Sequence, residues 1–349
     1  LGPPPQADAV HELLDALDEA ASRGVVVNLL IDSFGQRLGG VLMSSAHKAA
    51  LEARLAALGH KNAVVTYYHP ARAIQRKLGG GQHVKIQVSD GGDAIFGSSN
   101  ITRSSFEGWN EYSVAVRGPV AALLLDSYRD IGGTVDEAHI AWLRAMAHEP
   151  SPHIELEYWF CNPNLLQGAS GPLGWPGPNV VTDQMIAMID EARHSLSITS
   201  FYFKPVEPVL AALVRAAARG VAVEVYHSHR DALPATELAW LAAAVTYPRL
   251  LAAGVRIWEN RHGEHSKIVL VDEAWAAFGS YNFEDAAHDR LAEAMLASRD
   301  PRTVGPAVAI FDELRQHPDN MPVTAETVRT LPVRLKVKRA VFGRFKRWM

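Results

Sequence analysis

The sequence predicts two α/β lobes, each built around a central β-sheet. A set of polar residues and glycines occurs twice at one constant displacement. In both halves an amphipathic helical segment leads into a short run of β-branched residues. The chain has 349 residues, 48% of them hydrophobic and 21% charged. It can therefore bury a full core without disulfide bonds, and the single cysteine, Cys161, cannot form one within the chain.

The helix–strand pattern is clearest near the start of each half. Ala9–Ser22 places its apolar residues on one helical face, and the buried strand Val25–Ile31 is expected to follow. Val206–Ala218 repeats this pattern in front of the strand Val221–Tyr226. The pairing of a helix with a buried strand, found twice, favours sheets that are covered by helices.

The second half contains one more predicted strand, Ser195–Phe203, in front of its helix. The first half lacks this strand, because the chain opens with Leu1-Gly-Pro-Pro-Pro5. We therefore expect residues upstream of Leu1, including a strand, to belong to the first lobe. The predicted organisation is a first lobe (1–150), a Gly/Pro-rich connection (151–180), a second lobe (181–332) and a basic amphipathic tail (333–349).

The repeat has a fixed displacement of 182 residues, because 265 − 83 and 293 − 111 give the same number. Each copy contains His-x-Lys-x4-Asp, then Gly-Ser-x-Asn, then a glutamate. The first copy consists of His83, Lys85, Asp90, Ser98, Asn100 and Glu111, and the second of His265, Lys267, Asp272, Ser280, Asn282 and Glu293. The residues between these positions differ, so the two copies share their polar set. This favours a functional site over a purely structural repeat.

The first copy predicts a β-hairpin. His83–Val88 alternates polar and apolar residues, which is typical of a half-buried strand with His83 and Lys85 on one face. Asp90 and two glycines form a turn, and Ala94–Gly97 returns as the second strand. The second copy does the same around Asp272. Each hairpin thus gathers an imidazole, an ammonium group, a hydroxyl and an amide at one edge.

This set of groups is suited to phosphoryl transfer. Two lysines and two asparagines can neutralise a phosphodiester without a metal ion. One histidine can attack phosphorus and the other can act as general acid and base. Glu111 and Glu293 are the natural partners for the far ring nitrogens. No metal site and no cofactor are expected, and the shared chemistry requires both copies in one site.

Simpler explanations exist for some members of the set. Turn propensity alone favours Asp90 and Asp272 as turn and packing residues over chemical ones. Ser98 and Ser280 could cap the local backbone. The segment Asn162–Asn179, rich in Gly, Pro and Asn, is typical of a connecting loop. A functional alternative is that this loop overhangs the cleft and carries Trp175 toward an apolar substrate.

The doubled motif resembles the signature of the phospholipase D superfamily. The resemblance implies a pseudo-symmetric fold of two lobes, each a mixed central sheet flanked by helices, with the active site at the lobe interface and a phosphohistidine intermediate. It also implies that His83 is the nucleophile and His265 the acid and base, although the near symmetry of the sequence does not fix that order.

The cardiolipin synthase-like branch is the most similar part of that superfamily. Residues 249–259, before the second motif, and Phe278–Phe283 resemble segments of that branch. Glu284 and its successors replace an Arg-Ser that the branch often carries, which leaves the acceptor open. A phosphatidyltransferase acting on phospholipid, with phosphatidylglycerol as donor and acceptor, is the leading hypothesis. The alternatives are a phospholipase D hydrolase that releases phosphatidic acid and a nuclease of the same superfamily.

The distribution of charge along the chain bears on whether the partner is a nucleic acid or a membrane. The formal net charge is −4, yet Val333–Met349 holds seven basic residues and no acidic one, which leaves −11 for the rest. An acidic body argues against a broad nucleic-acid surface, although Arg72, Arg76 and Lys77 could contact a headgroup or a phosphate backbone. A helical tail would place Val337, Phe345 and other apolar residues on one face and bind an anionic membrane. A solvated basic tail, or a strand over 333–338, fits the pattern equally well.

These features favour a peripheral membrane protein, with the cytoplasmic face of the inner membrane as the expected location. A membrane segment upstream of Leu1 is compatible with the resemblance. The sequence does not predict the oligomeric state.

Overall fold

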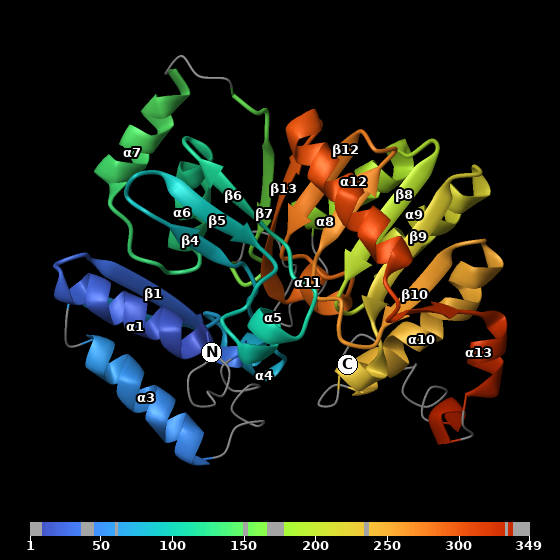
Figure 1. Cartoon of the computed structure of the whole chain (residues 1–349), viewed down its shortest axis with the longest axis horizontal. Coiled ribbons are helices and arrows are strands. Elements are labelled where there is room, and N and C mark those ends of the chain that lie inside the picture. Colours follow the sequence, from blue (N-terminus) through green and yellow to red (C-terminus); the bar gives the residue numbers. More distant parts are fainter. Residues whose placement is uncertain are drawn as a thin grey trace.

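The structure is a computed structural model that describes residues 9–35, 45–59, 62–148, 153–165, 178–233, 237–331 and 334–337. It confirms the α/β class and the two mixed lobes (Figure 1). The first lobe contains, in chain order, α1 (Ala9–Ser22), β1 (Val27–Asp32), α3 (Ser45–Gly59), β2 (Ala63–Tyr68), α4 (Ala73–Lys77), β3 (Gly81–Gln82), β4 (Ile86–Val88), β5 (Asp93–Gly97), α5 (Arg103–Glu107), β6 (Ser113–Arg117), α6 (Val120–Asp130) and α7 (Glu137–Ala145).

The rest of the chain forms the second lobe and its connection. Its elements are β7 (Glu157–Cys161), α8 (Val180–Glu191), β8 (Ser195–Ser200), α9 (Glu207–Ala218), β9 (Ala222–Ser228), α10 (Glu237–Ala252), β10 (Arg256–Asn260), β11 (Ile268–Val271), β12 (Trp275–Gly279), α11 (Asp285–Asp289), β13 (Leu291–Ser298), α12 (Pro301–Gln316), β14 (Asn320–Val323) and α13 (Ala325–Thr330). None of the helices in the described ranges is long and apolar enough to span a bilayer.

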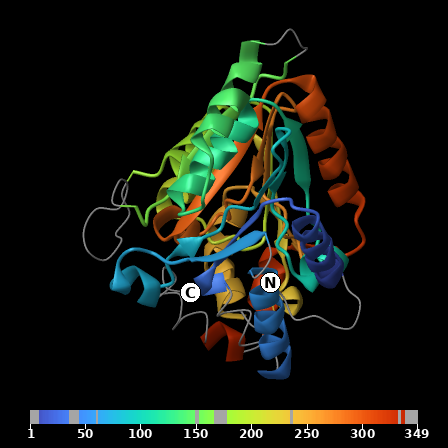
Figure 2. The ribbon, with the colours of Figure 1, turned by 90° about the vertical axis from the view of Figure 1, so that its left-hand side faces the viewer.

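The second lobe is organised around a mixed sheet. Its strand order is β14-β10-β9-β8-β11-β12-β13-β3, and β7 also pairs with β13. Strands β8, β9 and β10 are parallel, whereas β11, β12 and β13 are antiparallel. One face packs against α8, α9 and α10 through side chains such as Met185, Leu213 and Tyr247. The other face packs against α12 through Val304, Ala307 and Phe311. Figure 2 shows α12 along one flank of the strands, with the green helices α6 and α7 of the first lobe on the other flank.

The first lobe has two smaller sheets. Strands β1 and β2 form a parallel pair, and β4, β5 and β6 form an antiparallel sheet. The inner face of the latter carries Ala94 and Phe96, which pack in one core with α6, α7 and with Ala294 and Leu296 of β13. Hydrophobic burial of this kind, at about 25 cal/mol per Å², holds the two lobes together.

The lobes are also joined by backbone pairing. Strand β3 of the first lobe runs parallel to β13, with Leu291 opposite Gly81 and Ala292 opposite Gln82. Strand β7 also pairs with β13, in the antiparallel direction, with Glu293 opposite Cys161 and Ala297 opposite Glu157. The predicted connection 151–180 is therefore not only a loop, because β7 falls within it.

The strand predicted for the first motif needs a correction. The strand expected over His83–Val88 begins only at Ile86. Gly81 and Gln82 pair with β13, whereas Ile86–Val88 pair with β5. The backbone therefore passes from one sheet to the other at His83–Lys85, and this bend places the histidine between the lobes.

Candidate active site

The two histidines are each paired with the glutamate of the other copy. His83 Nδ1 lies 3.1 Å from Glu293 Oε1. His265 Nδ1 lies 2.8 Å from Glu111 Oε1. One copy therefore provides the imidazole and the other provides its carboxylate, in both directions. Such crossed pairs require both hairpins to meet in a single composite site.

Backbone hydrogen bonds between the lobes set this geometry. The His83 N–H donates to the carbonyl of Ala292, the residue before Glu293, at 2.8 Å. The His265 N–H donates to the carbonyl of Asn110, the residue before Glu111, at 2.9 Å. Each histidine is thus held directly beside its carboxylate partner by main-chain bonds, which no side-chain substitution removes.

The two serines support the carboxylates. Ser98 Oγ donates to Glu111 Oε2 at 2.5 Å, and Ser280 Oγ donates to Glu293. Both serines are completely buried. Each serine therefore fixes the glutamate of its own copy, which in turn contacts the histidine of the other copy. The two hydroxyls also accept hydrogen bonds from the backbone N–H groups of Tyr112 and Ala294, so they support the carboxylates and the neighbouring backbone together.

The two asparagines differ in their contacts. Asn100 Nδ2 lies 3.5 Å from His265 Nε2, so this amide of the first copy reaches the ring of the second. Asn282 Oδ1 accepts a hydrogen bond from the Phe201 N–H at 3.2 Å. Its amide nitrogen lies 3.4 Å from Glu284 Oε1. Asn282 thereby ties the end of β8 to the second motif.

The two lysines carry the positive charge of the site. Lys85 Nζ donates to the His83 carbonyl at 2.5 Å, and Lys267 Nζ donates to that of His265. Burial and the neighbouring Lys267 lower the pKa of Lys85 to about 7. Burial lowers the pKa of Lys267 to about 8, against the opposing effect of nearby carboxylates. An anionic ligand would raise the pKa values of both lysines, because it favours the charged ammonium group.

The pKa values of both imidazoles are lowered by their surroundings. Burial and the two lysines lower the pKa of His83 well below its usual value. Burial and Lys267 lower that of His265 to about 3. Both rings are therefore neutral at neutral pH. Burial would raise the pKa of Glu111, but His265 and Lys267 outweigh it and hold the value at about 2.

The surroundings of the two rings are unequal. The indole of Trp109 stacks on His265 with centroids 4.9 Å apart and an angle of 18°. Phe201 meets the same ring edge-on at 4.5 Å. The His265 side chain is only 4% exposed, whereas that of His83 is 21% exposed. Lobe one thus contributes Trp109 to the wall around the second histidine.

The contacts of Asp272 are those of a turn residue, and the catalytic role predicted for Asp90 and Asp272 stays a prediction. Strand β11 separates Lys267 from Asp272, which are five residues apart, or about 16 Å at 3.3 Å each. The Asp272 carboxylate accepts hydrogen bonds from the backbone N–H groups of Arg193, His194 and Ser195. Burial would raise the pKa of Asp272, but these three donors outweigh it and keep the pKa below its usual value. Asp272 is a turn residue that anchors the start of β8.

We expect Asp272→Ala to lower the free energy of unfolding by about 1–3 kcal/mol, because three backbone donors lose their acceptor. The rate constant of the reaction should not change, because the histidines lie at the other end of β11. Thermal unfolding and kcat, measured on the same preparation, check this. A large loss of kcat with an unchanged Tm would restore the chemical role of Asp272.

Sequence reasoning missed several residues near the site. Asp32, at the end of β1, accepts a hydrogen bond from the Gln82 N–H at 2.9 Å and braces the residue before His83. Asn164 donates to the carbonyls of Gly81 and Arg290 and so links the two lobes. Asp32 follows the predicted strand Val25–Ile31, which is a signal that could have indicated it, whereas Asn164 lies in the predicted connecting loop and had no such signal. No spacing rule connects them to the motif.

A buried acidic–basic group lies behind the second motif. Lys204 Nζ is 3.4 Å from Glu284 Oε2, with side chains 0% and 7% exposed. Glu264, immediately before His265, accepts a hydrogen bond from Asn110 Nδ2 at 3.1 Å. Burial raises the pKa of Glu264 to about 7. Within the described ranges, no group of three or more His, Cys, Asp or Glu residues is placed to hold a metal ion.

Two predicted features fall outside the described residues. Trp175 belongs to residues 166–177, and most of the basic tail belongs to residues 338–349. Of the tail, the structure describes residues 334–337, which are helical, and Leu335 is buried in the core of the second lobe.

The comparisons with known proteins agree with this geometry. The family model for the PLD-like domain of cardiolipin synthase matches residues 7–129 and 185–315. Cardiolipin synthase 2 of Bacillus cereus is 29% identical over 287 residues, which are 78% of this chain and 51% of that protein. Cardiolipin synthase A of Pectobacterium carotovorum is 28% identical over 283 residues, 79% of this chain and 55% of that protein. The chain spans about half the length of the curated relatives it matches.

The fold is also similar to a solved structure. Phosphatidylserine synthase of Haemophilus influenzae has a TM-score of 0.69 and 16% sequence identity, over 99% of this chain and 87% of that one. At this identity the similarity concerns the fold. The doubled motif, its crossed pairs and the family match over both lobes lead to one assignment: the chain belongs to the family of the PLD-like domain of cardiolipin synthase.

Proposed function

We propose that the protein is a phosphatidyltransferase that moves a phosphatidyl group between phosphatidylglycerol molecules through a phosphohistidine intermediate. The crossed histidine–glutamate pairs carry this proposal. They give one site a buried imidazole, His265, and a half-buried one, His83, each with a glutamate on its far nitrogen, next to two lysines. Double displacement at phosphorus needs a nucleophile and an acid–base group in this arrangement.

The contacts of His83 support its role as the nucleophile. Its Nδ1 lies 3.0 Å from the backbone carbonyl of Ser280, which can only accept a hydrogen bond. The proton of the neutral ring is therefore on Nδ1, and Nε2 keeps its lone pair for attack. The greater exposure of the His83 side chain also suits a group that must reach the substrate phosphorus.

The contacts of His265 support its role as acid and base. Ionised Glu111 at its Nδ1 stabilises the protonated ring during turnover, as does the stacked indole of Trp109. A bound phosphodiester is an anion and therefore raises the pKa of His265. The ring can then hold the proton that the leaving group needs.

The proposed reaction has two balanced steps. His83 Nε2 forms a bond to phosphorus while the bond from phosphorus to the glycerol oxygen breaks, and His265 gives its proton to that oxygen. The hydroxyl of a second phosphatidylglycerol then attacks phosphorus, loses its proton to His265, and releases His83. Lys85, Lys267 and Asn100 stabilise the charge on the nonbridging oxygens. The net reaction converts two phosphatidylglycerol molecules into cardiolipin and glycerol.

Product analysis tests the proposal against its alternatives. Mass spectrometry after incubation with phosphatidylglycerol vesicles should detect cardiolipin and free glycerol in equal amounts. Phosphatidic acid with glycerol would show that water is the acceptor and that the enzyme is a hydrolase. Cleavage of a DNA control without any lipid product would identify a nuclease. The family match to cardiolipin synthase domains supports the lipid substrate.

The pH dependence should follow the buried lysines. Lys85 and Lys267, with pKa values of about 7 and about 8, are charged below these values and neutral above them. Burial also raises the pKa of Glu293 to about 8, so the alkaline limb belongs to the coupled set and not to one residue. We expect kcat/KM to fall as the pH rises through 7–8, because neutral lysines bind the phosphodiester poorly.

The corresponding limb of kcat should lie at higher pH, because the bound anion stabilises the charged lysines in the complex. Initial rates across the pH range, with substrate far below and far above KM, check this. An alkaline limb at the same pH in both profiles would contradict the role of the lysines in binding phosphate.

We also propose that the tail contributes to peripheral membrane binding. Residues 338–349 contain Lys338, Arg339, Arg344, Lys346 and Arg347 and no acidic residue. Each basic residue contributes about 1 kcal/mol near an anionic surface. A truncation after Val337 retains Leu335, which packs in the core. We expect this truncation to weaken co-sedimentation with phosphatidylglycerol vesicles at least ~10-fold, with no change for phosphatidylcholine vesicles. Equal binding by the truncated and intact chains would contradict this role.

A further inference from the structure

One aromatic side chain of the first lobe lies against the second histidine. Trp109 follows α5, and its indole stacks on the His265 ring with the centroids 4.9 Å apart and 18° between the planes. Phe201, just after β8, contacts both rings, with its centroid 4.5 Å from that of His265 and 4.6 Å from that of Trp109. The His265 side chain is only 4% exposed. These two aromatic rings therefore shield the imidazole from water.

Backbone contacts between the lobes hold the indole in this place. The Asn110 N–H donates to the Gly263 carbonyl at 2.8 Å, and the His265 N–H donates to the Asn110 carbonyl at 2.9 Å. These bonds fix Trp109 beside Gly263. Gly263 has a φ of 121°, and a Cβ atom at this position would overlap Cδ1 of the indole. The indole thus occupies the space that a side chain at Gly263 would need.

The internal repeat provides a comparison for this contact. The displacement of 182 residues relates Trp109 to Leu291 and Gly81 to Gly263, because 291 − 109 and 263 − 81 both give that number. Leu291 pairs with Gly81, and its Cδ2 atom would lie 3.3 Å from a Cβ at that glycine. The same contact between the lobes therefore occurs twice. It involves an indole beside the second histidine and a smaller aliphatic side chain in the other copy.

The second step of the proposed reaction depends on which nucleophile reaches His265. An alcohol and water meet the chemical requirement equally. In either case an oxygen–phosphorus bond forms, the bond from phosphorus to His83 Nε2 breaks, and His265 takes the proton of the nucleophile. The concentration of water far exceeds that of any alcohol. Transfer to an alcohol therefore requires a site that excludes water from this position.

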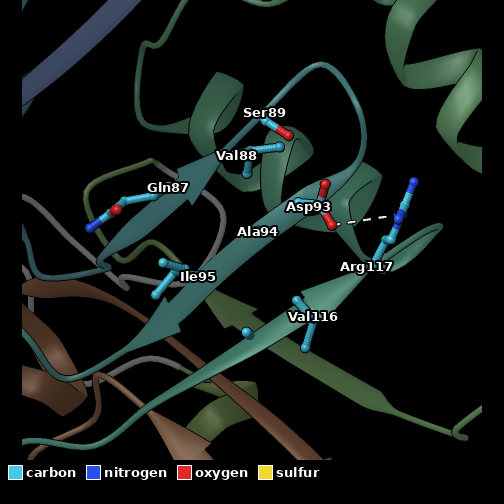
Figure 3. A pocket seen from close by; sticks show the side chains of 9 residues that line it. Gln87, Val88, Ser89, Asp93, Ala94, Ile95, Val116 and Arg117 are labelled. Carbon is cyan, nitrogen blue, oxygen red and sulfur yellow. Dashed lines mark ion pairs between the residues drawn. The ribbon is translucent and has the colours of Figure 1, made fainter. Parts of the chain in front are cut away.

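A hollow elsewhere in the first lobe does not meet this requirement. It has a volume of about 520 Å³, lies over β4, β5 and β6, and is lined by Gln87, Ile95 and Arg117 among others (Figure 3). Of the described residues that line it, none belongs to either copy of the motif. Asp93 and Arg117 pair with each other there at 3.6 Å. The hollow thus offers no contact to an acceptor that reacts at His265.

We propose, on the basis of the function proposed above, that Trp109 determines the choice of acceptor by excluding water from His265. The acceptor class is a primary alcohol on a carbon chain. Trp109 is only partly buried, so part of its surface remains accessible to a ligand. The carbon chain of an alcohol gains hydrophobic contact with this surface, whereas water gains none. Without the indole, water can fill the space next to the polar groups of the site.

The ratio of products tests this proposal. With phosphatidylglycerol vesicles, Trp109→Ala should raise the ratio of phosphatidic acid to cardiolipin at least ~10-fold over that of the unchanged protein. Trp109→Phe is the milder change, keeps an aromatic ring, and should raise the ratio by a smaller factor. Both products come from one phosphohistidine adduct, so their ratio does not depend on the fraction of folded enzyme. The same ratio in both variants as in the unchanged protein would overturn the proposal.

Two further variants are matched controls. Leu291→Ala removes the side chain at the equivalent position of the other copy, and Trp142→Ala removes an indole of α7 that is 50% exposed. Neither should change the ratio of products, because neither residue stacks on His265. An equal rise of the ratio in Leu291→Ala would overturn the proposal, because looser packing between the lobes would then explain the effect.

The same measurement separates the role of Trp109 from the proposed function. Cardiolipin from the unchanged protein, together with an unchanged ratio in Trp109→Ala, would overturn only the role of Trp109. Phosphatidic acid as the main product of the unchanged protein would overturn the proposed transfer reaction, and the role of Trp109 with it. Added 1-butanol gives a second readout. The ratio of phosphatidylbutanol to phosphatidic acid should fall at least ~10-fold in Trp109→Ala, and an unchanged ratio would contradict the selection of alcohol over water.

Discussion

Replacing His83 by alanine is expected to reduce turnover of phosphatidylglycerol at least ~10⁴-fold, because the reaction loses the atom that bonds to phosphorus. The loss should appear in kcat, with vesicle binding unchanged, because the lysines and the tail remain. Quantitative mass spectrometry of cardiolipin over time measures it. His83→Ala should also abolish any covalent phosphatidyl adduct, which intact-protein mass spectrometry of acid-quenched samples detects.

The control for this prediction is His153→Ala, which removes an exposed histidine far from the motif in sequence. Its activity should equal that of the unchanged protein. Addition of a chelator should likewise leave the activity of the unchanged protein intact, because the proposed chemistry uses only side chains. Substantial turnover by His83→Ala, or an adduct on another residue, would assign the nucleophile elsewhere. Loss of activity with the chelator would require a metal-dependent mechanism.

Replacing His265 by alanine is expected to reduce turnover by about 10²–10⁴-fold, because the leaving alkoxide receives no proton. This variant differs from the first in its response to the leaving group. A phosphodiester with a nitrophenol leaving group needs no acid, so adduct formation should recover. Breakdown of the adduct should stay slow, because the acceptor still lacks its base. A burst of nitrophenol equal to the enzyme concentration, followed by slow release, is the expected time course.

The opposite pattern would reverse the roles of the two histidines. If His265→Ala abolished the burst and His83→Ala kept it, the nucleophile would be His265. The crossed pairs would still define one composite site in that case. Glu293→Gln and Glu111→Gln form a matched pair of substitutions. Glu293→Gln should slow the step that depends on His83, and Glu111→Gln should slow the step that depends on His265. Impairment confined to the histidine of the same copy would contradict the crossed arrangement.

Much of the fold could be predicted from local patterns. The helix predicted over Ala9–Ser22 has those bounds in the structure, because its apolar spacing has a helical period over four turns. The strand predicted over Ser195–Phe203 ends at Ser200, where the chain turns toward Asn282. The strand predicted over His83–Val88 was wrong in its first half. An alternating pattern predicts which way the side chains point. It does not show that Gly81 and Gln82 pair with β13 while Ile86–Val88 pair with β5.

The sequence by itself determined the composition of the site. A constant displacement of 182 residues identified two equivalent sets of groups, and the chemistry of those groups indicated phosphoryl transfer. Spacing could do this because each set is local, within one hairpin and the strand after it. The same symmetry prevented the sequence from distinguishing the two histidines or their partners.

Only the tertiary structure decided how the two sets combine. Pairing of β3 with β13, and of Asn110 with Glu264, places each histidine beside the glutamate of the other copy. It also encloses His265 between Trp109 and Phe201 while His83 stays more exposed. Most of these differences arise from contacts between residues more than 150 positions apart, such as His83 and Glu293 or Asn110 and Glu264. Such contacts depend on how the lobes pack, and no local pattern in the chain encodes them.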